Sequence, residues 1–243
     1  QVHAVVAGDL ADWPFRNEPG MAGAGVFRAE AHIDNGTVKF QPDWPAAEHM
    51  DAALSFIADG FTVDGRAQLA GVGVSTLKAG IQRFSASELT VDAVTAGDAS
   101  RYLALLSASP LHAKYGEVMD NLRAEGKANA TFAMVLPLGH EQPHAAKVDG
   151  SVVLDGARLR EQRWNLDFQQ VRGQASYDQD GFIANALQVR SEGEPGALTL
   201  RAGPQVQDPA NAFEAQLQAS LDIGGMLGRV ESLKWLLPHA RGR

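Results

Sequence analysis

Apolar and polar residues alternate along most of the chain with a period of two. In the segment 27–34, Phe27, Ala29, Ala31 and Ile33 occupy every second position. This spacing puts successive side chains on opposite faces of a β-strand, so that one face is apolar and the other is solvated. The pattern therefore predicts an antiparallel sheet with one apolar face. Further alternating segments are 52–58, 61–69, 77–81, 89–93, 128–136, 148–154, 164–168, 171–177 and 213–221.

Two turn signals separate neighbouring segments of this pattern. Asn35-Gly36 lies between two alternating runs, and Asn-Gly is the preferred pair for a type I′ turn, so we expect a hairpin there. Asp59-Gly60 predicts a second hairpin between 52–58 and 61–69. The segment 191–208 contains several Gly and Pro residues, and we interpret it as a loop between strands or a mobile edge.

Three segments change to a helical period. The segment 102–106 has apolar residues at i, i+1, i+3 and i+4, and either Asp98 or Ser100 can cap its start. The segments 115–122 and 223–233 repeat the spacing of an amphipathic helix. This order divides the chain into approximate sub-units, which are strands at 1–97, a helix pair at 98–125, strands at 126–221 and a helix at 222–237.

Composition narrows the class of protein. The chain has 243 residues and a net charge of −8, which argues against nucleic acid as a partner because phosphate backbones require a basic surface. It has no cysteine, which excludes disulfides and thiolate metal sites. The first residues do not have the pattern of a signal peptide, and no stretch approaches the ~20 apolar residues of a spanning helix. We expect a segment of a longer protein.

One motif suggests metal chemistry. His140-Glu141-Gln142-Pro143-His144 matches the H-E-x-x-H pattern of zinc proteases, in which two histidines share one face of a helix. Pro143 lies inside the motif and disrupts that helix, so we interpret the segment as a polar loop and keep a zinc enzyme as an alternative. The sequence has no G-x-S-x-G elbow and no P-loop. We expect no enzyme activity, no catalytic residue, no metal and no cofactor.

The apolar faces are the remaining candidate for function. They either close into the core of a sandwich or barrel, or they line an open trough that receives acyl chains. The faces are rich in Ala, Gly and Val, and only 7% of all residues are aromatic, so the side chains leave width between them. A sheet with this much apolar face requires a cover, and the predicted helices are few.

Several loose motifs are spread along nearly the whole chain. They are 10–15 (LADWPF), 25–29 (GVFRA), 36–45 with FQPDWP at its end, 103–106 (LALL), 109–111 (SPL), 136–138 (LPL), 171–173 (VRG) and 237–242 (LPHARG). In order and spacing these motifs resemble the YhdP family of AsmA-like envelope proteins.

This resemblance implies a fold, a location and a function. It implies an elongated, curled antiparallel sheet with a few short helices, whose hydrophobic groove passes phospholipids between the inner and outer membranes. The chain would then be a periplasmic segment of a protein anchored in the inner membrane by a part outside this sequence. Phospholipids are the implied partner, together with other envelope proteins. A structural or adaptor β domain with a protein client in outer-membrane biogenesis is the alternative.

The groove interpretation names a set of lining residues whose only role is to present apolar surface. They are Phe27, Ala29, Ile33, Val38, Phe40, Leu54, Phe56, Val63, Leu89, Val91, Phe132, Met134, Val152, Leu166, Phe168, Leu217 and Leu221. The helices at 102–106 and 115–122 are expected to cap or gate the trough.

Overall fold

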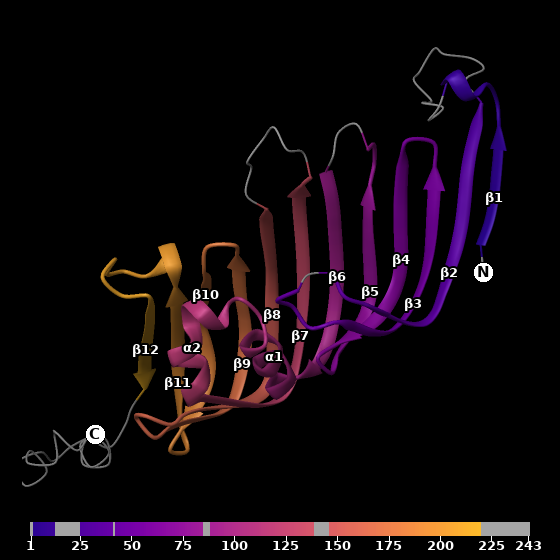
Figure 1. Cartoon of the computed structure of the whole chain (residues 1–243). Helices are drawn as coiled ribbons and strands as arrows, with labels where there is room; N and C mark the ends of the chain where they lie inside the picture. Colours follow the sequence, from indigo (N-terminus) through magenta and orange to yellow (C-terminus); the bar gives the residue numbers. More distant parts are fainter. Residues whose placement is uncertain (1, 13–24, 41, 85–87, 139–145, 220–243) are drawn as a thin grey trace, which may run out of the picture. The chain divides into compact units, whose positions relative to one another are not determined.

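The structure is a computed structural model that describes residues 2–12, 25–40, 42–84, 88–138 and 146–219. In these residues twelve strands form one antiparallel sheet, and every inner strand lies between its two sequence neighbours (Figure 1). β1 and β12 end the order, so the sheet is open. The mainly β, antiparallel fold class predicted from the alternation is confirmed. The strands are β1 Val2–Ala7, β2 Val26–Val38, β3 Ala47–Ile57, β4 Gly60–Leu69, β5 Val72–Ile81, β6 Glu88–Asp98, β7 Leu122–Pro137, β8 Lys147–Glu161, β9 Leu166–Asp178, β10 Phe182–Ser191, β11 Glu194–Ala202 and β12 Phe213–Ala219.

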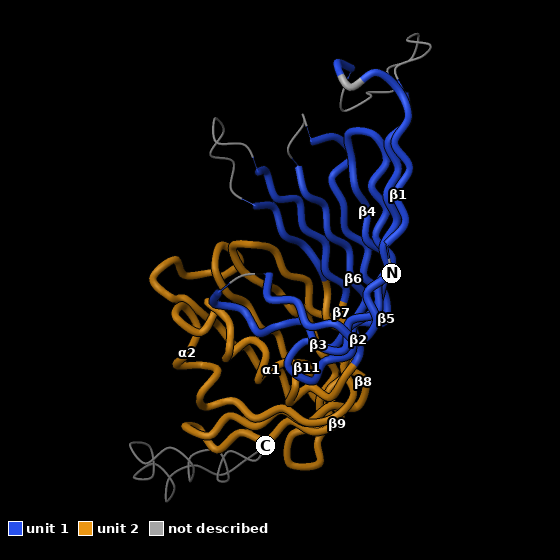
Figure 2. Tube along the Cα trace, turned by 45° about the vertical axis from the view of Figure 1, so that its right-hand side comes forward, with its two compact units in different colours: residues 1–96, 131–150 blue, residues 97–130, 151–243 orange. Residues whose placement is uncertain are grey.

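The chain divides into two compact units (Figure 2). Unit 1 comprises residues 1–96 and 131–150, and unit 2 comprises residues 97–130 and 151–243. The boundaries fall inside β6, β7 and β8, so each of these three strands contributes one part to each unit. Each unit is described below by itself.

Two α-helices follow β6 and belong to unit 2. α1 (Ala99–Ser107) begins at Asp98, whose carboxylate accepts the backbone N–H of Ser100 at 2.9 Å. α2 (His112–Asn121) continues directly into β7. Both predicted helices of this region are confirmed, and Asp98 rather than Ser100 is the cap. The third predicted helix, at 223–233, lies outside the described residues, and so does Leu221. Short 3-10 turns lie at Leu10–Asp12 and Gly203–Gln205. None of the helices in the described ranges has the length and hydropathy needed to cross a membrane.

The hairpin predicted at Asn35-Gly36 is wrong, because both residues lie inside the single strand β2. Asn35 takes a φ of +50°, as a turn residue would, but Gly36 does not take the second positive φ of a type I′ turn. The single left-handed residue makes a β-bulge, and the register with β3 shifts there. The Asn35 N–H donates to the Asp51 carboxylate of β3 at 2.9 Å, and the Arg66 guanidinium donates to the same carboxylate. These two hydrogen bonds, of which that from Asn35 has the larger effect, hold the pKa of the Asp51 carboxyl below its ordinary value.

The interpretation of 191–208 as a loop or mobile edge is also wrong over part of its length. The alternation did not predict β11, which occupies Glu194–Ala202 and pairs with β10. The two strands are joined by Glu192-Gly193, and both residues have positive φ, as a two-residue hairpin of type I′ requires. The Asp59-Gly60 prediction is confirmed as a hairpin, with Ala58 and Asp59 as its turn residues and Gly60 already paired in β4.

Within several strands the apolar alternation changes phase. In β8, Val152 and Leu154 are at even positions whereas Ala157 and Leu159 are at odd ones, and Gly156 between them has a φ of +73°. One inserted residue brings the following side chains back to the same face and bends the strand. The predicted segments 164–168 and 171–177 are likewise parts of a single strand, β9, with Trp164 left outside it. Further residues with positive φ at such places are His49 in β3, Gln170 in β9 and Ala186 in β10.

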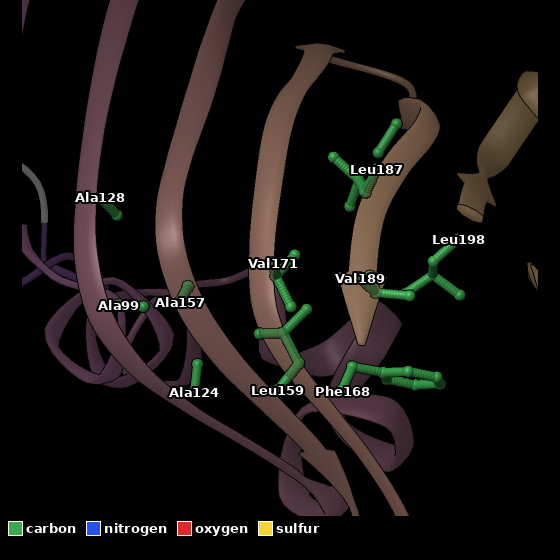
Figure 3. Close-up of a cluster of buried hydrophobic side chains, with 11 residues drawn as sticks. Ala99, Ala124, Ala128, Ala157, Leu159, Phe168, Val171, Leu187, Val189 and Leu198 are labelled. Atoms are coloured by element: carbon green, nitrogen blue, oxygen red, sulfur yellow. The ribbon is translucent and has the colours of Figure 1, made fainter. Parts of the chain in front are cut away.

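The buried core is unequal between the units. Unit 2 holds a cluster of buried apolar side chains from β7 to β11 together with Ala99 at the start of α1 (Figure 3). In unit 1 the buried cluster consists of Met50, Ala52 and Ala67. Most of the apolar side chains of β2 to β6 are therefore not fully covered.

Candidate functional site

A continuous row of apolar side chains crosses five strands of unit 1. Directly paired residues of an antiparallel sheet project from the same face, with their Cβ atoms about 5 Å apart. The register of the strands therefore aligns these side chains into one strip that runs across them. In strand order from β2 to β6 the row is Ala31, Leu54, Val63, Ala79 and Val91. Val2 of β1 pairs with Ala31 and extends the row to a sixth strand.

Two parallel rows widen this strip. One contains Ala29, Phe56, Phe61 and Ile81, and the other contains Ile33, Ala52, Gly65, Leu77 and Ala93. We call the three rows from β2 to β6 together the apolar face of unit 1. A single Gly is its smallest member, and none of its members is charged or polar.

The opposite face of the same strands is polar. One row there contains His32, Ala53, Asp64, Lys78 and Asp92, and the next contains Glu30, Ser55, Thr62, Gly80 and Thr90. The sheet of unit 1 is thus amphipathic, and its two faces meet different surroundings.

Exposure distinguishes the apolar face of unit 1 from an ordinary core. The five residues of its central row are only half-buried although all of them are apolar, whereas Ala52 and Ile81 in the two outer rows are buried. No α-helix lies among the described residues of unit 1, since α1 and α2 both fall in residues 97–130. An apolar sheet face is normally covered by a second layer of the same domain. The apolar face of unit 1, which is only partly covered along its central row, is therefore a candidate site for an apolar ligand or partner.

An aromatic stack lies at one end of this face, beside the turn between β3 and β4. The rings of Phe56 and Phe61 stack with centroids 5.4 Å apart, and Phe84 stacks on Phe61 at 6.4 Å. The N–H of Phe84 donates to the carbonyl of Asp59 at 2.7 Å, which fixes the segment after β5 against the turn. Phe84 remains 43% exposed, so the apolar face ends in accessible aromatic surface.

In unit 2 the corresponding apolar side chains are covered by α1. Tyr102 and Leu103 of this helix pack against the buried cluster, and Ala99 at its first turn is 5% exposed. Beneath the helix the strands present small residues, with Ala124 and Ala128 on β7 and Ala157 on β8 (Figure 3). Small side chains allow the helix to approach the sheet closely.

α2 is held to unit 2 by polar contacts. Lys114 Nζ and the Tyr115 hydroxyl both donate to the carbonyl of Asp180, at 3.0 and 3.3 Å, in the turn between β9 and β10. Arg163, in the turn between β8 and β9, donates to Glu117 at 2.7 Å. None of the residues of α2 is buried. The helix therefore bridges two turns rather than filling a core.

The predicted lining residues fall into three groups. Eight lie on the apolar face of unit 1 or continue it by one alternation step: Phe27, Ala29, Ile33, Leu54, Phe56, Val63, Leu89 and Val91. The second group lies elsewhere in unit 1. Phe132 and Met134 are half-buried in the part of β7 that belongs to this unit. Val38 pairs with Ala47 at the end of β2, and Phe40 lies beyond β2, where the centroid of its ring is 6.3 Å from that of Trp44. Val152, Leu166, Phe168 and Leu217 belong to or pack against the core of unit 2.

The structure adds residues that the sequence interpretation did not include in the lining set. Phe61, Ala31, Ala79 and Ile81 share the apolar face with the predicted residues. Local alternation places Ala31, Ala79 and Ile81 on the apolar faces of their strands, but their neighbours across the sheet depend on strand pairing, which no local pattern specifies. A local signal for Phe61 was available, because a two-residue turn at 58–59 puts it directly opposite Phe56.

Other kinds of site have little support in the described part of the chain. A hollow of about 320 Å³ in unit 1 is lined mainly by polar side chains, including His32, Asp51, Asp64 and Arg66. A second one, of about 250 Å³, is lined by residues that include Lys78, Asp92 and Phe132. Most of the residues that line the two hollows lie outside the apolar face, which contributes Ile33, Ala52 and Gly65 to the first and Ala93 to the second. Among the described residues no three His, Asp or Glu side chains are placed to hold a metal ion. The H-E-x-x-H segment, 140–144, lies outside the described residues.

Comparison with known proteins now identifies the family. The model of the YhdP protein family matches residues 1–240. The chain belongs to the YhdP family. The resemblance drawn from its short motifs is thereby confirmed.

One curated relative of this YhdP-family chain has a stated activity. It is the Intermembrane phospholipid transporter YhdP of Escherichia coli (strain K12), which is 34% identical over 119 residues. The aligned stretch covers 48% of this chain and 9% of the relative. No solved structure matches the chain.

Proposed function

We propose that this chain carries the acyl chains of phospholipids along the apolar face of its sheet, between the inner and outer membranes. It would act as a periplasmic segment of a YhdP-family protein anchored in the inner membrane outside this sequence, and so support lipid homeostasis and the barrier of the outer membrane. The observation that carries the proposal is the half-exposed apolar row that crosses β2 to β6. The relative named as an intermembrane phospholipid transporter supports the choice of ligand.

The hydrophobic effect explains why such a surface helps a lipid to move. Burying one methylene group is worth about 0.8 kcal/mol, so an acyl chain of roughly 16 carbons costs on the order of 12 kcal/mol to expose fully to water. A strip of apolar side chains removes much of this cost, because an acyl chain that lies on it is partly withdrawn from water. Because neighbouring rows are chemically alike, the free energy of a bound chain changes little from one row to the next, and the chain can slide.

The face requires no chemical step and no cofactor to do this. Its rows contain Ala, Val, Leu, Ile, Phe and one Gly, while the charged residues of the same strands lie on the opposite face. We propose that the predicted lining residues present apolar surface only, and that the protein is not an enzyme. Phospholipid is bound by its tails, and the headgroup stays in water.

The test uses two pairs of facing residues on the same two strands. Leu54 and Val63 pair on the apolar face, and Ser55 and Thr62 pair on the polar face one position away. Leu54→Asp with Val63→Asp places two carboxylates in the proposed lipid path. Ser55→Asp with Thr62→Asp is a matched control, because it places the same two charges opposite one another on the same strands and so introduces a comparable cross-strand repulsion.

The measurement is native mass spectrometry with lipid extraction, on protein purified from a Gram-negative host. We expect the unchanged chain and the control to retain phospholipid, and the Leu54/Val63 variant to lose at least about tenfold of it, because a charge excludes an apolar tail from its surroundings. Equal lipid in both variants would overturn the proposal. A lipid-free chain that is monomeric and cooperatively folded would favour the adaptor alternative, with a protein on the apolar face.

A further inference from the structure

The α1–α2 hairpin, residues 99–121, occupies the place of a simple turn between two neighbouring strands. β6 ends at Asp98 and β7 begins at Leu122, and these strands are adjacent in the sheet. Elsewhere neighbouring strands are joined by turns as short as Ala58-Asp59 and Glu192-Gly193. The sheet can therefore form its strand order without any contribution from the docked position of this hairpin.

The hairpin is packed shallowly against the apolar side chains of unit 2. Ala99 is the one buried residue of α1, and α2 has none. Ser109 between the helices is also buried, and Tyr102 and Leu103 are half-buried. Leu106 on α1 is 36% exposed. Helices of nine and ten residues are too short to be stable by themselves, so their docking depends on these few contacts.

Polar contacts supply further attachment, and one of them is the backbone N–H of Gln162, which donates to the Asn121 carbonyl at 2.9 Å. The Asp180 carbonyl accepts from Lys114 and Tyr115, and Glu117 pairs with Arg163. The side chains of Glu117 and Arg163 are 84% and 39% exposed, and an ion pair of that kind contributes little because water screens it. Segments held by few buried contacts and exposed hydrogen bonds are the first to open in a native protein.

We propose that the α1–α2 hairpin is a displaceable occupant of the apolar surface that the clustered side chains of β7 to β11 form in unit 2, and that it competes with phospholipid tails for this surface. The inference rests on the proposed function. Tyr102 and Leu103 cover side chains of the kind that stay half-exposed in unit 1, so a tail that binds there has to displace α1. The contacts of α2 with the β8–β9 and β9–β10 turns determine how readily the hairpin leaves the sheet, and they thereby regulate the binding of lipid to unit 2.

Because the chain has no cysteine, a covalent link can be placed at a single pair of positions. Glu117→Cys with Arg163→Cys removes the ion pair, and a short bismaleimide then fastens α2 to the turn between β8 and β9. Glu161→Cys with Arg163→Cys is the control, because it removes the same arginine and links the turn to the last residue of β8 without holding the hairpin. The Arg163 guanidinium contacts both carboxylates in the unchanged chain.

Lipid contact is read separately in each unit. A photoreactive diazirine side chain replaces Leu54 in unit 1 or Leu154, which packs against the core of unit 2, and the full chain is incubated with phosphatidylethanolamine–phosphatidylglycerol vesicles. We expect the 117–163 link to reduce lipid labelling at Leu154 at least about fivefold, because a tethered hairpin keeps its place on the sheet, and to leave labelling at Leu54 unchanged. The same variant without the linker, and the linked control, should label at Leu154 at least as strongly as the unchanged chain.

Two results would overturn the inference in distinguishable ways. If the 117–163 link leaves labelling at Leu154 unchanged while Leu54 is labelled, lipid binds but the hairpin does not compete with it. If Leu54 is not labelled in any variant, the proposed function itself fails, and the competition fails with it.

Discussion

Asp98 is the residue on which three donors converge at the junction of β6 and α1. Its carboxylate accepts the backbone N–H of Ser100 at 2.9 Å, the Ser100 hydroxyl at 2.6 Å and the backbone N–H of Gly126 at 2.9 Å. These hydrogen bonds, led by that of the Ser100 hydroxyl, hold the pKa of Asp98 below its ordinary value of 3.8. One side chain thus caps α1 and fastens it to β7.

We expect Asp98→Ala to lower the free energy of unfolding by about 1–2 kcal/mol at neutral pH, because it removes an N-cap and leaves two backbone donors without their acceptor. Since the pKa of Asp98 is lower in the folded than in the unfolded chain, the ionised carboxylate stabilises the folded chain fully above pH 3.8. This stabilisation is lost progressively as the pH falls through the pKa of the folded chain. The difference between the unchanged chain and the variant should therefore shrink below about pH 4.

Urea unfolding of both chains between pH 7 and pH 3 measures this difference. Asp98→Asn is the companion variant, because its amide oxygen still accepts hydrogen bonds but does not titrate, and it should lose less stability than Asp98→Ala at pH 7. A difference that stayed constant down to pH 3 would show that the ionised carboxylate is not what stabilises this junction.

At the scale of the element, the sequence identifies most strands but not where they bend. The alternation in β3 to β8 and the helical spacing near Tyr102 are local patterns, and the structure bears them out. Asn35-Gly36 misled the prediction because a bulge and a hairpin turn both use a left-handed residue, and only the partner strand decides between them. The phase change between Leu154 and Ala157 is present in the sequence, and it marks the bend in β8.

Two glycines at adjacent bends provide a test of this element-level view. Gly126 in β7 has a φ of +101°, and a Cβ built on it would lie 3.0 Å from the Cα of Ala157. Gly156 in β8 has a φ of +73°, and a Cβ there would meet nothing within 4 Å. Both positions disfavour an L side chain through the backbone, but only Gly126 adds a steric conflict with a neighbouring strand.

We expect Gly156→Ala to lower the free energy of unfolding by about 1 kcal/mol, which is the cost of placing an L residue at a positive φ. Gly126→Ala should cost at least about 2 kcal/mol, because the backbone of β8 must also move. Chemical denaturation of the two variants measures both values. Equal losses would mean that β7 and β8 do not approach closely at these bends.

At the scale of the whole molecule, the candidate site depends on pairings that no single segment contains. Leu54 and Val63 face one another across a short hairpin, but Ala79 and Val91 join their row only through the register of further strands. Sequence patterns therefore predicted apolar strand faces, and the choice between a covered core and an open face required the tertiary structure. The cover that α1 provides in unit 2 likewise depends on contacts between Leu103 and strands that are distant in sequence.

Unit 1 is discontinuous in sequence, and this has a consequence for its stability. It needs residues 131–150 in addition to residues 1–96. Thr131, Phe132 and Asp149 from the later segment line one hollow with Lys78 and Asp92 of β5 and β6, so the two segments pack together. A fragment that ends at residue 96 lacks these neighbours, and the edge of β6 in it loses its pairing with β7.

We therefore expect the fragment 1–96 to aggregate or to unfold at a markedly lower temperature than the fragment 1–150, because an uncapped apolar edge strand pairs with other chains. Circular dichroism melts and size-exclusion chromatography of the two fragments compare them directly, and the complete chain provides the reference. If 1–96 is monomeric and melts at the same temperature as 1–150, residues 131–150 add no stability to unit 1. In that case the apolar face of β2 to β6 would be maintained by its own five strands, and the neighbouring β7 and β8 segments would serve only to extend it.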